Sequence, residues 1–291
     1  MSTMRSDQAS KETLTLEIEL MLKKDVEEHY KKYEEINQEK FESGERPNFG
    51  IIKDTLGLRF MKCVAFAYTR GDSLESIDKT FMQPAVERLL RFCTEIDKRK
   101  MQGKEWFWPS GENLYFGEGN CLEAYNTVSI FTFYAWLLCF DTPKDKIEAL
   151  SHYITPAGSA ISVDTVIGRF QSGREIGENN SQKSELFPIW TNMFTLKGDE
   201  QIAVIKDYLN NWAKYLTHYH GVPFASLATY LNMKHKSNKT LVKQFERNEH
   251  MAFYGYWAWE VALAVKFCGV DDTEFRDHPL YPVDAVDYIK G

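Results

Sequence analysis

The sequence lacks the features that mark membrane, secreted and β-rich proteins. Its most apolar stretch, residues 252–268, contains Glu260 and Lys266 and is shorter than the roughly 20 apolar residues that a membrane span needs. The opening segment, MSTMRSDQASKETL, is polar and contains no apolar signal core. No segment alternates β-branched with polar residues, as half-buried strands do. These absences predict an all-α protein of the cytoplasm that has no membrane partner.

Cysteine is scarce, and basic residues are outnumbered by acidic ones. The five cysteines form no CxxC pair, and Cys63, Cys139 and Cys268 lie within apolar runs, where a free thiol behaves as a small hydrophobic side chain. This pattern favours a reducing compartment over a disulfide framework. The net charge of −7 disfavours direct binding to nucleic acid and would steer a basic protein toward the surface.

No motif in the sequence assigns an enzyme, a metal site or a cofactor. A di-iron bundle needs Glu-x-x-His pairs, whereas the nearest approach, Glu148 and His152, is spaced by four residues. No GxSxG nucleophile elbow occurs. The glycines around 117–119 lack the Lys-Ser/Thr of a phosphate-binding loop. We therefore expect no catalytic residue, no metal and no cofactor.

Apolar residues recur every three or four positions along most of the chain, which predicts a multi-helix bundle with little or no β-structure. Residues 155–183 are enriched in Gly, Ser and Asn, as connections are. We expect two packed halves: an N-terminal helical half over 1–154, a connecting segment over 155–183, and a C-terminal helical half over 184–291. The expected helices cover about 8–41, 51–70, 84–100, 120–140, 144–153, 184–195, 199–219 and 252–268.

Glycine, proline and capping residues predict where these helices begin and end. Gly71 is expected to end a helix, and Asp72 or Ser73 to cap the next one. Pro84 falls where a new helix can begin, because proline suits the first helical turn. Asp141-Thr142-Pro143 is expected to open the helix at 144–153 in the same way.

The last helix, 252–268, is apolar on nearly all sides, and we predict that it lies buried at the centre of the C-terminal half. Gly269 is expected to close it at positive φ. The segment 271–273, Asp-Asp-Thr, is expected to cap a short turn. Pro279 and Pro282 are then expected to make the chain extended.

Two features of the sequence each allow two interpretations. Glu260 lies in an apolar run, where an unpaired carboxylate is costly. We expect it to bond a neighbouring tyrosine, tryptophan N–H or arginine and so to fix helix packing, with a functional role as the alternative. The aromatic loop 103–119 contains Trp106 and Trp108, which either pack in the core or anchor a protein partner.

Three segments near the C-terminal end form a motif. Residues 255–260 read GYWAWE, 269–273 read GVDDT and 276–284 read RDHPLYPVD. This run resembles the C-terminal motif of the PoNi immunity proteins, in which GYW-[AS]-[FW]-E and G-[ILV]-D-D-[ST] precede DxPYYPxDLV. Leu280 and Ala285 replace the more usual aromatic residue and leucine. The matching residues are Gly255, Tyr256, Trp257, Trp259, Glu260, Gly269, Asp271, Asp272, Asp277, Pro279, Tyr281 and Pro282.

Two further matches to the same family lie upstream. Residues 68–75, YTRGDSLE, resemble YSxGxSLEEL of its N-terminal half, and residues 207–212, DYLNNW, resemble its YLxxWY helix. The resemblance thus includes both family halves. It implies a cytoplasmic immunity protein whose partner is a cognate secreted bacterial toxin of the PoNe type. Toxins of that type are DNases similar to the PD-(D/E)xK nucleases.

The resemblance also implies how the protein acts. A nuclease surface that holds DNA is usually basic, and an acidic protein would compete for it. We therefore expect stoichiometric inhibition through protein–protein binding, with no direct contact to nucleic acid, and the sequence leaves self-association open. The acidic residues expected to bind the toxin are Glu112, Glu118, Glu123, Glu175, Glu178 and Glu185. The alternatives are a helical adaptor or scaffold without a toxin partner, and a helical-bundle enzyme or ligand binder.

Overall fold

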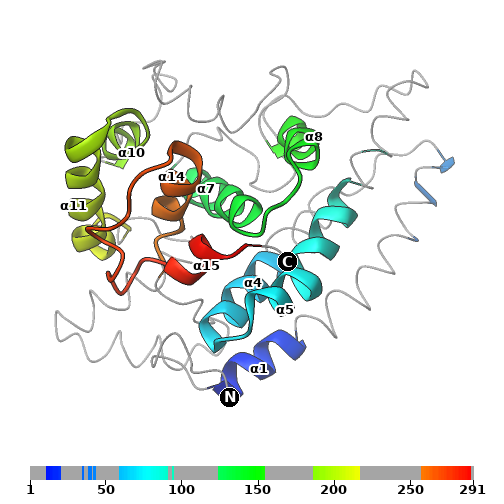
Figure 1. Ribbon diagram of the computed structural model, residues 1–291. Helices are drawn as coiled ribbons and strands as arrows, with labels where there is room; N and C mark the ends of the chain where they lie inside the picture. The colour runs from blue at the N-terminus through cyan, green and yellow to red at the C-terminus, as the bar shows by residue number, and fades with distance from the viewer. Residues whose placement is uncertain are drawn as a thin grey trace, which may run out of the picture. The chain divides into compact units, whose positions relative to one another are not determined.

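The structure is a computed structural model. It describes residues 11–20, 59–90, 124–154, 186–216 and 257–289, together with positions 35, 39, 40, 42, 43 and 94. Within these residues every regular element is a helix and no strand occurs, so the all-α prediction is confirmed (Figure 1). Contacts divide the chain into two units. The first consists of Met1–Cys121 and Thr142–Ser162, and the second consists of Leu122–Asp141 and Val163–Gly291.

Helix α7 (Ala124–Cys139) belongs to the second unit, although α8 (Lys144–Ile154), which follows it, belongs to the first. The reason is packing, because α7 makes its most extensive contacts with α14 (Trp259–Cys268), beside which it lies in Figure 1. A division of the chain at residue 154 instead groups α7 with the N-terminal helices. The organisation into 1–154, 155–183 and 184–291 stays a prediction.

In the first unit, α4 (Arg59–Arg70) is a buried helix that contacts α1 (Lys11–Leu20) and the short α5 (Leu74–Ile77). Arg70 joins these elements: Nη1 donates to Thr15 Oγ1 at 3.0 Å, and Nε donates to Asp72 Oδ1 at 2.8 Å. Gly71 follows with a φ of 85°, which ends α4 as expected. Ser73 caps α5 by accepting the Ser76 N–H at 3.2 Å, which confirms the second of the two predicted caps.

Pro84 lies in the first turn of the α-helical stretch at 83–90, as predicted, but this stretch directly continues an earlier helical run. The chain is helical from Leu74 to Leu90, and Pro84 lies inside this run. Just before it, η3 (Asp78–Met82) is a π-helical turn in which the Gln83 N–H reaches back to the Asp78 carbonyl. Because proline has no N–H and its ring crowds the carbonyl four residues earlier, a regular α-helical ladder would be broken here. The wider π turn accommodates that break.

The core of the second unit is built from aromatic side chains. Four tryptophans are fully buried, one each from α7, α10 (Leu186–Thr195), α11 (Gly198–Leu216) and α14: Trp136, Trp190, Trp212 and Trp259. Trp136 meets Trp259 edge-on, with ring centroids 5.6 Å apart, and Phe131 meets Trp190 in the same way at 5.4 Å. Such pairs contribute about 1 kcal/mol beyond area burial. The prediction that the GYWAWE helix lies at the centre of this core is confirmed.

The boundaries of that central helix differ from the prediction. The helix begins at Trp259, whereas Trp257 and Ala258 lie outside it, and residues 252–256 lie outside the described part of the chain. The Ala258 N–H donates to the Leu280 carbonyl at 2.8 Å. This long-range bond joins the backbone just before the helix to the segment that follows the helix, so the Ala258 N–H bonds outside α14.

The prediction of an extended chain at Pro279 and Pro282 is also wrong. The Tyr281 N–H donates to the His278 carbonyl, and the Val283 N–H donates to the Tyr281 carbonyl, both at 2.9 Å. These bonds form consecutive turns. Pro282 then directly precedes α15 (Val283–Asp287), which packs against α14 and α7. A proline suits both a tight turn and the start of a helix, because its φ is already fixed near the required value.

Candidate functional site

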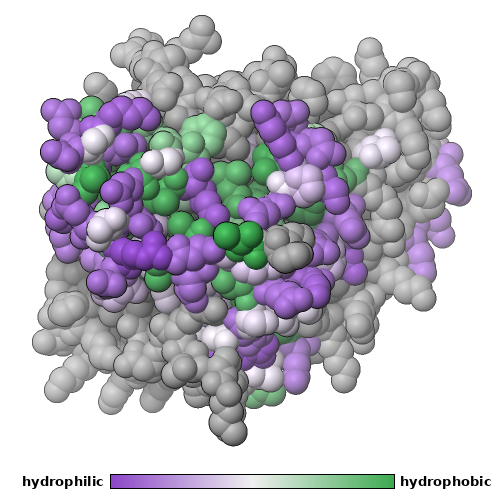
Figure 2. Space-filling view, in the orientation of Figure 1, coloured by the Kyte–Doolittle hydropathy of each residue, from purple (hydrophilic) through white to green (hydrophobic). Residues whose placement is uncertain are grey.

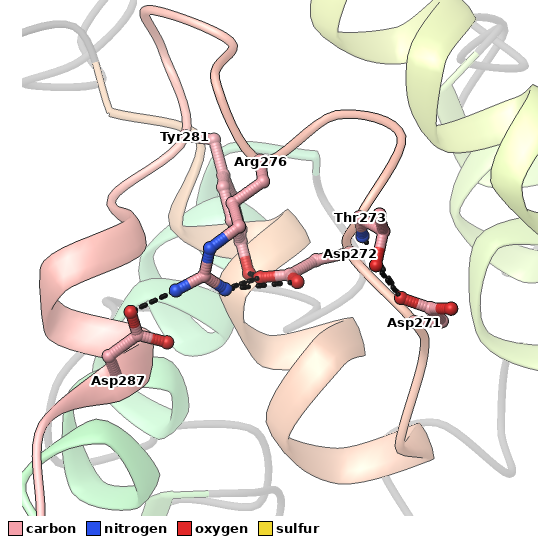
Figure 3. Close-up of polar contacts among 6 residues, drawn as sticks. All are labelled: Asp271, Asp272, Thr273, Arg276, Tyr281 and Asp287. Carbon is pink, nitrogen blue, oxygen red and sulfur yellow. Dashed lines mark hydrogen bonds and ion pairs between the residues drawn. The ribbon is translucent and has the colours of Figure 1, made fainter.

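The C-terminal corner, residues 269–288, contains a network of bonded polar side chains in the described part of the second unit. Gly269 closes α14 with a φ of 67°, and its N–H donates to the Val265 carbonyl at 3.0 Å, as predicted. Asp271 Oδ1 then accepts the Thr273 N–H at 3.0 Å and the Thr273 hydroxyl at 2.5 Å (Figure 3). The two bonds lower the pKa of the Asp271 carboxyl. The predicted capping turn at 271–273 is therefore confirmed.

Asp272 is the hub of the corner. Its two oxygens accept from Arg276 Nη1 at 3.1 and 2.9 Å, and Oδ2 also accepts the Tyr281 hydroxyl at 2.8 Å. The second terminal nitrogen of Arg276 pairs with Asp287 on α15, so one guanidinium joins two carboxylates (Figure 3). The Asp272 side chain is 14% exposed and Tyr281 is 2% exposed, so the charge-assisted bond between these two residues is largely shielded from water, whereas Arg276 is partly exposed. Burial raises the pKa of Tyr281, and the hydrogen bond to Asp272 raises it further, so the phenol stays protonated.

Three further contacts hold the corner against the helices of its unit. Lys206 on α11 donates to Glu274 Oε2 at 2.9 Å, and Ala258 donates to Leu280 as described above. Near the end of the corner, the rings of Tyr288 and Phe140 meet with centroids 5.8 Å apart. The corner is thus pinned to α11, to the start of α14 and to the residue that follows α7. In Figure 2, hydrophilic side chains gather over α11 and the corner on the left of the view.

Glu260, in the first turn of α14, is 1% exposed. The Tyr208 hydroxyl on α11 donates to its Oε1 at 3.2 Å, so the expectation of a tyrosine partner that fixes helix packing is confirmed. Burial raises the pKa of Glu260 from 4.5 to about 7, against the opposing effects of its own backbone N–H, the Tyr208 hydroxyl and the Trp212 indole. The side chain therefore lies in the core.

The structure brings together most of the motif residues. Trp257, Trp259, Glu260 and Tyr281 are buried, whereas Asp277 and Pro279 are exposed within the corner. Gly255, Tyr256, Trp106 and Trp108 lie outside the described residues. The six glutamates that we expect to bind the toxin also lie outside the described residues, and their role stays a prediction. They are Glu112, Glu118, Glu123, Glu175, Glu178 and Glu185.

Sequence reasoning missed Arg276, which joins Asp272 to Asp287. The spacing of four residues between Asp272 and Arg276 is the signal that could have identified that pair. Lys206 was missed because its partner Glu274 lies 68 positions away. In the described part of the chain, no three His, Cys, Asp or Glu side chains are placed to hold a metal ion. None of its helices is long and apolar enough to cross a membrane.

Comparison with known proteins agrees with the motif. Residues 162–285 match the family model of the PoNe immunity proteins (PoNi), C-terminal. The matched range contains α10, α11, α14 and all but the end of the corner. The C-terminal resemblance is therefore confirmed, and the N-terminal one stays a prediction. Neither the search of curated proteins nor the search of solved structures found a match.

Proposed function

We propose that this protein is an immunity protein, which binds a cognate secreted bacterial toxin and neutralises it by stoichiometric protein–protein inhibition. The observation that carries the proposal is the match of residues 162–285 to the C-terminal model of the PoNe immunity proteins. By the same reasoning the toxin is a DNase of the PoNe type, and the immunity protein acts in the cytoplasm. It carries out no reaction of its own and needs no cofactor.

Surface charge supports a basic partner. Among the second-unit side chains that the structure describes, exposed carboxylates outnumber exposed cations. The exposed carboxylates are Asp141, Asp199, Glu200, Asp207, Asp271, Glu274, Asp277 and Asp287, and the exposed cations are Lys197 and Lys206. A DNase must attract the negative phosphate backbone, so its substrate surface is basic. An acidic protein would be steered to that surface with a fast, salt-dependent association rate.

The internal bonding of the corner supports action by binding. A surface whose side chains are already fixed loses less conformational entropy when a partner docks. Asp272, Arg276 and Asp287 are held in one network, and Glu274 is held by Lys206. Such a surface suits recognition, which requires a defined shape and charge pattern.

The test is co-expression of this protein with the toxin encoded by the neighbouring reading frame. We expect cells that express both to survive and to retain intact DNA, and purified toxin to form a 1:1 complex with the protein. A toxin point variant without nuclease activity serves as the matched control for expression cost. If the toxin kills equally fast with and without this protein, the immunity function is refuted.

The predicted electrostatic contribution has its own experiment. The six predicted contact residues are replaced by lysine: Glu112, Glu118, Glu123, Glu175, Glu178 and Glu185. We expect slower association and weaker protection by this variant, and a steep fall of wild-type affinity with salt. Undiminished binding that is insensitive to salt would exclude these residues as the interface, and would leave the immunity function itself standing.

A further inference from the structure

Glu260 is a buried carboxyl group that has no compensating charge among the described residues. Its Oε1 accepts one hydrogen bond, from Tyr208, and its Oε2 is buried without a hydrogen bond in the described part of the chain. Its neighbours in sequence are aromatic or apolar: Trp259, Val261 and Ala262 are also fully buried. An ionised carboxylate in such surroundings is far less stable than the neutral acid.

The cations described in this unit are directed at other groups. Lys206 pairs with Glu274, and Arg276 pairs with Asp272 and Asp287. The positive charges of Lys266 and Lys197 lower the pKa values of Cys139 and Cys268, and neither lysine is among the groups that shift the pKa of Glu260. No cation among the described side chains therefore neutralises Glu260.

The titratable groups on the surrounding elements do not supply a charge either. The group on α11 that faces Glu260 is Tyr208, a neutral donor. Helix α10 contains no titratable residue, and the described titratable side chains of α7 are Tyr134 and Cys139, both buried. Burial raises the pKa of Cys139 to about 12, so its thiol is neutral. Of the titratable groups of the corner and α15, four are exposed: Asp271, Glu274, Asp277 and Asp287. The buried or half-buried ones are Asp272, Arg276, His278, Tyr281, Asp284 and Tyr288, among which Asp272 bonds to Arg276 and Tyr281.

We propose that Glu260 is a proton-sensitive latch: it packs as a neutral acid in the folded second unit, and its ionisation loosens the contact between α11 and α14. The position of Glu260 lets its ionisation affect the C-terminal corner. Glu260 lies two residues after Ala258, whose N–H holds Leu280 of the corner, and α11 holds the corner through Lys206. Loosening the helix pair therefore loosens two of the attachments of the corner.

The direction of the pH dependence follows from which state holds the proton. The Glu260 pKa is about 7 in the folded protein and near 4.5 when the chain is unfolded. The contribution of Glu260 to the free energy of unfolding is fully present below about pH 4.5. It is lost as the pH rises through 7, because the unfolded state releases the Glu260 proton at a lower pH than the folded state does. A difference of about 2.5 pH units corresponds to a change of roughly 300-fold in the folding equilibrium constant.

Glu260→Gln tests the latch, because the amide keeps the shape of the neutral acid and cannot ionise. Urea unfolding of the full-length protein is followed for both forms from pH 5 to pH 8.5. We expect the folding equilibrium constant of the wild type to fall by about 100-fold relative to that of Glu260→Gln over this range. Glu274→Gln, at an exposed site of the same unit, is the matched control and should run parallel to the wild type. A constant ratio between wild type and Glu260→Gln would overturn the proposal.

Two measurements on the wild type keep the test independent of how well the variant folds. A carbon-13 NMR titration of the Glu260 carboxyl should show a midpoint near 7, and a midpoint near 4.5 would overturn the proposal. Amide hydrogen exchange, corrected for the intrinsic pH dependence, should show up to about tenfold more frequent opening of α11 and α14 at pH 8 than at pH 6. Equal opening at the two pH values would show that no latch exists.

Discussion

Replacing Asp272 with alanine should destabilise the second unit more than any other single change on its described polar surface. The substitution leaves the hydroxyl of the buried Tyr281 without its acceptor and leaves Arg276 with Asp287 alone. Losing a hydrogen bond to a charged, shielded group costs about 2 kcal/mol. The contact with Arg276, whose side chain is 40% exposed, adds no more than about 1 kcal/mol because water screens it. We therefore expect a loss of about 2–3 kcal/mol in the free energy of unfolding.

Urea unfolding followed by tryptophan fluorescence measures this loss. The signal reports mainly on the second unit, because Trp136, Trp190, Trp212, Trp257 and Trp259 lie in it and only Trp106 and Trp108 lie in the first. A double-mutant cycle with Tyr281→Phe separates the energy of the bond between Asp272 and Tyr281 from the other effects of Asp272→Ala. The coupling between Asp272 and Tyr281 should be about 1–2 kcal/mol.

Asp277→Ala is the matched control, since Asp277 is an exposed aspartate of the same corner and should change stability by less than about 0.5 kcal/mol. The reasoning fails if Asp272→Ala and Asp277→Ala cost the same. It also fails if Asp272→Ala and Tyr281→Phe are additive, because the 2.8 Å contact between them would then contribute nothing.

Three further changes test local features. Gly269→Ala should cost about 1 kcal/mol in urea unfolding, because φ is 67° and the added Cβ meets no atom within 4 Å, so only the backbone is strained. Gly198→Ala, equally open at φ 60°, should cost the same, and no loss at either site would contradict the left-handed backbone at these glycines. Ser73→Ala should cost about 1 kcal/mol in thermal or urea unfolding by removing the N-cap of α5, whereas Ser76→Ala should be nearly neutral, and equal effects would refute the cap. Cys139, whose pKa burial raises to about 12, should react with a thiol reagent only as fast as the protein opens; rapid labelling of this residue in the native protein, mapped by peptide mass spectrometry, would refute its burial.

The features that sequence predicted correctly depend on residues close together in the chain. A glycine after a buried helix can adopt positive φ, and an aspartate two residues before a threonine can accept both of its donors, whatever the rest of the fold is. Gly269 and Asp271 follow these rules, and Ser73 follows the equally local rule that a serine caps the helix that begins after it. The burial of α14 was equally predictable, because an apolar surface on nearly all sides leaves a helix no stable position except the core.

The features that sequence missed depend on partners far apart in the chain. The start of α14 is set by a hydrogen bond from Ala258 to Leu280, and residue type alone does not show that the preceding backbone is already engaged. A tyrosine was among the expected partners of Glu260, but the sequence does not show that this tyrosine is Tyr208, because it lies 52 positions away. The π turn before Pro84 was missed for a different reason: the preference of proline for a first helical turn does not show that the turn continues directly from an earlier helix.

The position of α7 decides what a match over residues 162–285 describes. The matched range supplies Trp190, Trp212 and Trp259, whereas Trp136, which packs against Trp259, comes from a segment that lies before it. Buried aromatic rings contribute through the area that they remove from water, so the core of the second unit is complete only when α7 is included. The unit that folds is therefore larger than the segment that the family model covers. A surface on the matched segment, including the C-terminal corner, depends for its shape on a helix that the match does not contain.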